Sequence, residues 1–190
     1  MNLLEHIIKK VEESLPASAR YSLLPDMPLI DDEIDDGETK LLVPGYRQLN
    51  GYACGAVSAY SVIKTFHPKI SYHKVYHDCN PSVDEGTGLP DLVRALRRNG
   101  VGVSERWGMT FKDVAEAIED GYPVIAGERT DDPESGHWVV IYGVGRKPNR
   151  VFTCGQPNKV AMSGKECFTW AEWRSYWDEY GLGLVCWGKC

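Results

Sequence analysis

The sequence has no apolar stretch that approaches the roughly 18 residues a membrane-spanning helix requires, so it predicts no membrane segment. It also has no run of basic residues, and its net charge of −6 argues against nucleic acid as a partner. The N-terminus is charged within its first six residues and lacks the pattern of a signal peptide. These absences favour a cytoplasmic location and a role other than nucleic-acid or membrane binding.

The six cysteines could form three disulfides, but other features argue against this pairing. With no signal peptide, and with 190 residues available to build a core, the chain does not need covalent cross-links, and we expect reduced thiols. His67, His73, His77 and Cys79 are close in sequence, yet their spacing does not match a common zinc site and no second cysteine pair completes one. The sequence therefore predicts neither a metal nor another cofactor.

The pattern of apolar residues, prolines and glycines predicts an α+β fold. Residues 1–39 form an extension, with a helix over 2–14 followed by an acidic linker, and residues 40–190 form the main domain. In that domain mostly helices come first, and strands with one late helix follow, which is typical of α+β proteins. Helices are expected over 54–67, 90–98, from 110 to about 120, and 169–180; strands are expected over 41–43, 122–126, 137–144, 151–154 and 182–187.

Three tryptophans of the late helix are spaced by three and four residues: Trp170, Trp173 and Trp177. This spacing puts them on one helix face. Such a face usually packs in a core, so we interpret it as packing and not as a ligand stack.

The motif QLNGYACG at 48–55 places a cysteine at the start of a predicted helix. A helix N-terminus favours a thiolate, so we expect the pKa of the Cys54 thiol to be lowered and Cys54 to be a nucleophile. The motif GHWVVIYG at 136–143 supplies a histidine at the start of a predicted strand. Alone, Cys54 would be interpreted as a buried structural thiol and His137 as a loop residue. Together they predict a catalytic pair in which His137 moves the proton.

Gln48 precedes Cys54 by six positions and could donate its side-chain amide to a developing oxyanion, together with the backbone N–H of Cys54. A surface polar residue before a turn is the alternative interpretation. The spacing has catalytic meaning only if Cys54 is the nucleophile, so the two assignments depend on each other.

These two motifs resemble those of papain-like cysteine peptidases, and most closely the branch with the bacteriocin leader-processing, or double-glycine, peptidases. The segments LVRALRRNG at 92–100, GYPVIA at 121–126 and FTWAEW at 168–173 extend the similarity. The resemblance implies a helical left lobe, an antiparallel β right lobe and an active site between them. It also implies a Cys-His-Asp or Cys-His-Asn triad, a peptide or protein substrate, and cleavage of a peptide or other amide bond through a thioester acyl-enzyme without a cofactor.

The chain departs from this family at the third position of the triad. Where the branch usually has Asp-Pro, this sequence has Gln156 followed by proline. The Gln156 carbonyl can accept a hydrogen bond from the Nδ1–H group of His137, but it cannot offer a negative charge to the imidazolium. Asn158 is an alternative orienting residue, and a Cys-His dyad is a third possibility. The substitution leaves open a slow, a specialised or a lost activity.

Two other functions are compatible with the same residues. One is an acyl-transfer or transglutaminase-like enzyme with the same Cys-His pair, in which an amine replaces water as the acceptor. The other is a catalytically silent module that binds a peptide in the same cleft, which the missing aspartate would favour.

Overall fold

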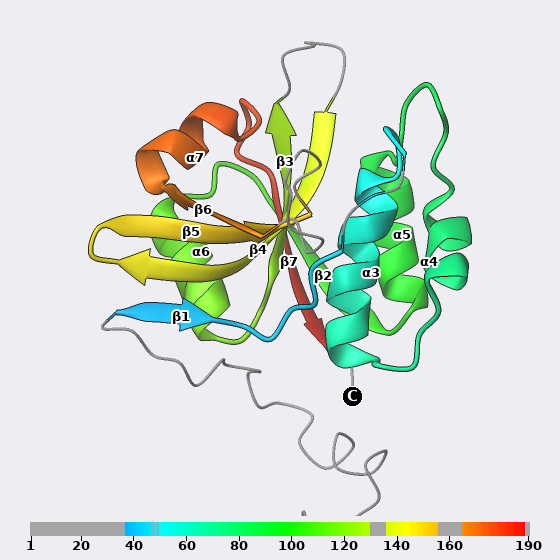
Figure 1. Ribbon diagram of the computed structural model, residues 1–190, viewed down its shortest axis with the longest axis horizontal. Coiled ribbons are helices and arrows are strands. Elements are labelled where there is room, and N and C mark those ends of the chain that lie inside the picture. Colours follow the sequence, from blue (N-terminus) through cyan, green and yellow to red (C-terminus); the bar gives the residue numbers. More distant parts are fainter. Residues whose placement is uncertain (1–36, 47, 49, 130–135, 156–164, 189–190) are drawn as a thin grey trace, which may run out of the picture.

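The computed structural model describes residues 37–46, 48, 50–129, 136–155 and 165–188 of the chain (Figure 1). Three helices group together on one side: α3 (Cys54–Phe66), α4 (Tyr72–Cys79) and α5 (Leu89–Arg98). Small and apolar side chains allow α3 to be buried on nearly all sides, and ten of its residues are buried. It ends just before Pro68, which cannot continue a helix.

An antiparallel sheet makes up the rest of the domain. Its strands are β2 (Val101–Arg106), β3 (Val124–Arg129), β4 (Gly136–Arg146), β5 (Asn149–Cys154), β6 (Glu166–Thr169) and β7 (Gly183–Gly188), with β1 (Glu38–Lys40) at one side. The order across the sheet is β2-β7-β3-β4-β5-β6, and β1 pairs with β4. The long central strand β4 therefore contacts β3 near its beginning and β1 near its end.

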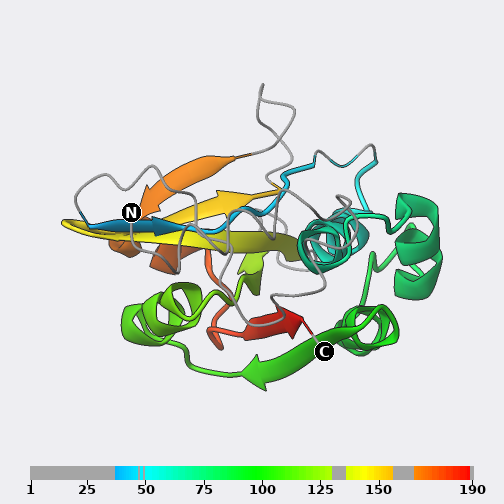
Figure 2. The same cartoon turned by 90° about the horizontal axis from the view of Figure 1, so that it is seen from below.

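Two short helices flank the sheet: α6 (Phe111–Glu119) and α7 (Trp170–Tyr176). Each begins with a capping box, in which a threonine hydroxyl accepts from a backbone N–H and an acidic side chain accepts from the threonine N–H. Figure 2 shows α6 on one face of the sheet, and α3, α4 and α5 at one end of it. The layout is the predicted α+β fold with a helical lobe and an antiparallel β lobe.

The structure confirms the predicted helices that begin near Cys54 and Pro90, and the two predicted capping boxes. The late helix is shorter than predicted, because it ends at Tyr176 and not at residue 180. The strand predicted at 41–43 was wrong in position, since β1 covers Glu38–Lys40 and only a bridge follows at Leu41.

Three elements were not predicted: α4, β2 and β6. The start of α4 has a local signal, because the Ser71 side chain accepts a hydrogen bond from the Lys74 N–H. The helix predicted over 2–14 lies outside the described residues.

Trp173 and Trp177 are fully buried, which confirms core packing for this helix face.

The described cysteines are all free thiols: Cys54, Cys79, Cys154, Cys167 and Cys186. Among the described residues, no helix combines the length and the apolar character needed to cross a membrane. The cytoplasmic location stays a prediction.

Candidate active site

Cys54 is the first residue of α3, and its side chain lies at the junction between the helical lobe and the sheet. Only 6% of the residue is exposed. Its sulfur interacts with the backbone N–H groups of Trp138, Gly55 and Cys54 itself. Trp138 immediately follows His137 on β4, so the fold brings the two motifs of the sequence together. Figure 1 shows the first turn of α3 and the beginning of β4 at the same end of the molecule.

Two hydrogen bonds fix the beginning of β4 on the helical lobe. The Ser58 hydroxyl, one turn into α3, donates to the carbonyl of Trp138 at 2.9 Å. The Trp138 indole N–H donates to the carbonyl of Thr87, just before α5, also at 2.9 Å. Trp138 thus joins β4 to both sides of the helical lobe, and its backbone N–H is held toward the Cys54 sulfur.

The contact between Gly55 and Thr87 shows how closely the first turn of α3 packs. A Cβ atom at Gly55 would lie 2.6 Å from the Cβ of Thr87, so only glycine fits directly after Cys54. The Cys-Gly pair of the motif therefore has a steric reason as well as a chemical one.

His137 is 8% exposed, and its Nε2 atom lies 3.2 Å from the carbonyl oxygen of Gly155. Because a carbonyl can only accept, this contact requires the Nε2–H tautomer and leaves Nδ1 as the basic nitrogen. The sequence-based prediction had Nδ1–H as the donor to an orienting residue, and the structure corrects this to Nε2–H. The ring is held by a backbone atom of the residue that precedes Gln156.

Burial determines the protonation of both groups. Desolvation raises the pKa of the Cys54 thiol, although the N–H groups of Trp138, Gly55 and Cys54 act in the opposite direction. Desolvation lowers the pKa of His137, and the Gly155 hydrogen bond opposes it. The expected lowering of the Cys54 pKa by the helix N-terminus is thus wrong, because the loss of hydration outweighs it. Both shifts favour the uncharged forms, a thiol at Cys54 and a neutral imidazole at His137.

The remaining predicted site residues are placed less completely. Gln48 is half-buried on the segment that leads to α3, and its side-chain oxygen is buried without a hydrogen-bond partner among the described residues. Gln156 and Asn158 lie outside the described residues, so their roles stay predictions. Sequence analysis missed Gly155, whose contribution is a main-chain carbonyl, and Glu128, which faces His137 across β3 and β4.

The histidines near α4 do not join this site. The Nε2 atoms of His73 and His77 are 3.1 Å apart on the exposed face of that helix. His67, in contrast, lies against Gly100. Within the described ranges, no group of three or more potential ligands could hold a metal ion.

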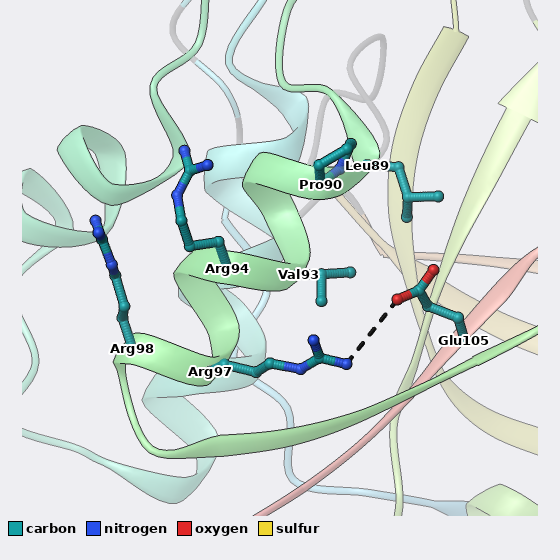
Figure 3. Close-up of a pocket in the computed structure, with 7 residues that line it drawn as sticks. All are labelled: Leu89, Pro90, Val93, Arg94, Arg97, Arg98 and Glu105. Carbon is teal, nitrogen blue, oxygen red and sulfur yellow. Dashed lines mark ion pairs between the residues drawn. The ribbon is translucent and has the colours of Figure 1, made fainter.

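A hollow of about 570 Å³ lies along α5 and not at Cys54 (Figure 3). Leu89, Pro90 and Val93 form its apolar part. Its arginines are engaged by acidic side chains: Arg94 with Asp91, Arg97 with Glu105 at 4.0 Å, and Arg98 with Asp78 at 3.9 Å. Asp78 also binds Lys74, at 2.8 Å, so it is shared between two cations.

Residues 40–183 match the Peptidase_C39 like family. The chain belongs to this family. The match spans both motifs and the elements between them, so the resemblance based on Cys54 and His137 is confirmed at the level of the family. Membership implies a cysteine peptidase. No curated protein is similar enough to count as a match.

Solved structures of C39 peptidases share the fold. A double-glycine motif protease from an AMS/PCAT transporter, solved in complex with a leader peptide, has a TM-score of 0.62 and 18% identity, covering 82% of this chain and 97% of that one. The peptidase domain of Streptococcus ComA has a TM-score of 0.63 and 17% identity, covering 77% of this chain and 99% of that one. A C39-like peptidase from Bacillus anthracis has a TM-score of 0.63 and 14% identity, covering 80% of this chain and 98% of that one. Likeness at these identities establishes the fold alone.

Proposed function

We propose that this C39-like protein is a cysteine peptidase that cleaves a peptide bond through a thioester formed on Cys54. The observation that carries the proposal is the position of Cys54 at the start of α3, with its sulfur against the backbone next to His137. The solved relative that binds a leader peptide supports a peptide as the substrate.

The reaction begins with a proton transfer within the neutral pair. His137 Nδ1 takes the proton of the Cys54 thiol as the sulfur attacks the substrate carbonyl, because the Nε2–H group is already engaged by Gly155. A tetrahedral intermediate forms, and its oxyanion accepts hydrogen bonds from the Cys54 N–H at the helix N-terminus and from the Gln48 amide. The unpaired atom of Gln48 is its side-chain oxygen, which accepts and does not donate, so the donor to the oxyanion is the NH₂ group of the same amide.

The imidazolium then returns its proton to the leaving amine, which departs and leaves a thioester between Cys54 and the acyl part of the substrate. Water resolves the thioester, with His137 again acting as the base. An amine in place of water would give acyl transfer by the same residues. The two reactions are separated by adding a primary amine and analysing the products by mass spectrometry.

A peptide-like epoxide that inhibits cysteine peptidases tests the nucleophile. We expect one adduct on Cys54, because the proposal gives this thiol a base in His137 and a binding site for a peptide-like ligand, whereas burial raises the pKa of Cys79 and Cys154 to about 12. Mass spectrometry of tryptic fragments locates the adduct. Labelling spread over several cysteines, or an unmodified Cys54, would contradict the proposal. An adduct on Cys54 without turnover of any peptide would instead favour a binding module.

The Gly155 carbonyl can be tested through the backbone. Gly155 has φ +100°, and a Cβ atom there would meet nothing closer than 3.7 Å, so Gly155→Ala is disfavoured by conformation and not by a clash. We expect the peptide to rotate, the contact with His137 to be lost, and epoxide labelling of Cys54 to slow by about tenfold or more. Gly108→Ala is the matched control, since Gly108 also has positive φ (+67°) and open surroundings. Equal rates in the two variants would show that the Gly155 carbonyl does not orient the ring.

A further inference from the structure

The site described so far has no negative charge to balance an imidazolium. Gly155 contributes a neutral carbonyl, and a glutamine at position 156 can contribute only an amide. A neutral acceptor fixes the tautomer of the ring but stabilises its charged form less than a carboxylate does. Any carboxylate that faces His137 from another strand is therefore of mechanistic interest.

Glu128 meets this description. It is directly opposite His137 in the antiparallel pair of β3 and β4. Residues in such a register project to the same face of the sheet, with Cβ atoms about 4.5–5.5 Å apart. Glu128 is only 8% exposed, which is unusual for a glutamate and keeps its electrostatic effect from being screened by water.

The position of Glu128 is fixed from both sides of its strand. His137 is its partner on β4, and Trp177, after α7, forms an isolated bridge with it on the other side. The neighbouring Asp178 N–H donates to the carbonyl of Gly127 at 3.0 Å. The backbone of Glu128 is thus held at the end of β3 that lies nearest to the start of α3.

Its influence also reaches the nucleophile. The charge of Glu128 contributes to the raised pKa of Cys54, after desolvation, so the carboxylate lies within electrostatic range of the nucleophile, and the strand register places it opposite His137. Among the charged groups near it in the described ranges are Arg129 on its own strand and Asp178, whose carboxylate lies on the Gly127 side. Because side chains alternate along a strand, Asp178 is on the face opposite to Glu128.

We infer that Glu128 is a positioning residue of the proposed active site, a carboxylate that faces His137 across the β3–β4 pair and stabilises its imidazolium form. The inference rests on the proposed function of Cys54 and His137. Glu128 acts through the ring and does not touch the reacting atoms. It supplies from a neighbouring strand the charge that an aspartate at position 156 would supply.

This role predicts that removing the Glu128 charge shifts the pH dependence of Cys54 alkylation. In the proposed active site Cys54 and His137 exchange a proton, and a nearby negative charge would raise both of the macroscopic pKa values of such a pair. Glu128→Gln removes the charge and keeps the shape of the side chain. Both titration steps in the pH profile of Cys54 alkylation should therefore move to lower pH by about one unit. Glu128→Asp retains the charge and should keep the curve close to that of the unmodified protein. A purely structural role would change the rate of Cys54 alkylation without shifting its dependence on pH.

The experiment measures the rate of Cys54 alkylation by iodoacetamide against pH in the full chain, with peptide mapping to isolate Cys54 from the other thiols. Asp178→Asn is the matched control, because it removes a carboxylate beside the same strand but on the other face. Melting curves identify any variant that is not folded, and Glu128→Asp then provides the comparison if Glu128→Gln is unstable. The expected result is a shift in Glu128→Gln alone.

The outcomes separate this inference from the proposed function. If His137→Ala alters the curve while Glu128→Gln leaves it in place, the inference about Glu128 is overturned and the proposed pair stands. If Asp178→Asn shifts the curve as much as Glu128→Gln, the effect is a general one of the protein charge and the inference is again overturned. If Cys54 titrates as an ordinary isolated thiol, unaffected by His137→Ala, the proposed function fails.

Discussion

Cys54→Ala is expected to abolish peptide cleavage, and His137→Ala to reduce it by about 10²–10⁴-fold, which is the contribution typical of a general acid–base group. The two losses have different causes. Without the sulfur no thioester forms, whereas without the imidazole the sulfur must lose its proton unaided. Burial raises the pKa of Cys54, so very little thiolate would exist at neutral pH in the absence of that base.

The measurement is the appearance of new termini in a mixture of unstructured peptides, followed by mass spectrometry. Cys167→Ala is the matched control, because Cys167 is an exposed thiol on β6, away from α3, and its loss should leave the rate unchanged. Full activity in Cys54→Ala would assign the nucleophile to another residue. Full activity in His137→Ala would mean that another group accepts the proton.

The pH dependence of cleavage follows from the same burial. His137 acts as a base only when its imidazole is neutral, and desolvation lowers its pKa below the ordinary value of 6.5. The acid limb of the rate profile should therefore lie below pH 6.5, and activity should persist into mildly acidic solution. Removing the base in His137→Ala should eliminate this limb.

The fold was predictable wherever a local signal specifies an element. The capping boxes at Thr110 and Thr169 identify the starts of α6 and α7, because their hydrogen bonds involve only residues within one helical turn. The edge strand β6 was not predictable in this way. It is held by pairing with β5 at residues distant in sequence, so its own four residues carry little information.

The site residues differ in the same way: a local motif predicts some of them, and only the fold places the others. Cys54 and His137 were predictable because each is a side chain in a distinctive motif. The Gly155 carbonyl was not, since every residue has a carbonyl and only the fold selects one. Glu128 was missed because its relation to His137 is a cross-strand register, which depends on the pairing of β3 with β4.

The protonation of the pair could not be obtained from sequence either. The position of Cys54 at a helix N-terminus suggests a stabilised thiolate, and three backbone N–H groups do favour it. Burial of the Cys54 thiol has the opposite effect on its pKa. The depth of that burial depends on how closely the β4 end of the sheet covers α3. Here that covering is tight enough for desolvation to dominate.

Trp177→Ala is expected to lower the free energy of unfolding by about 3–5 kcal/mol, the range found for removing a large aromatic side chain from a core. Trp177 is fully buried and packs edge-on against Trp170 and at a tilt against Trp173. Its indole N–H donates to the carbonyl of Leu182 at 2.8 Å. The variant loses this packing and leaves a buried carbonyl without its donor, which adds to the cost.

Thermal melting checks this prediction, and a loss of that size in a domain of this length corresponds to a fall in Tm of about 6–20 °C. Trp107→Ala is the matched control, because Trp107 is 58% exposed and its removal should change stability by less than about 0.5 kcal/mol. Equal melting of the two variants would contradict the role of Trp177 in the core.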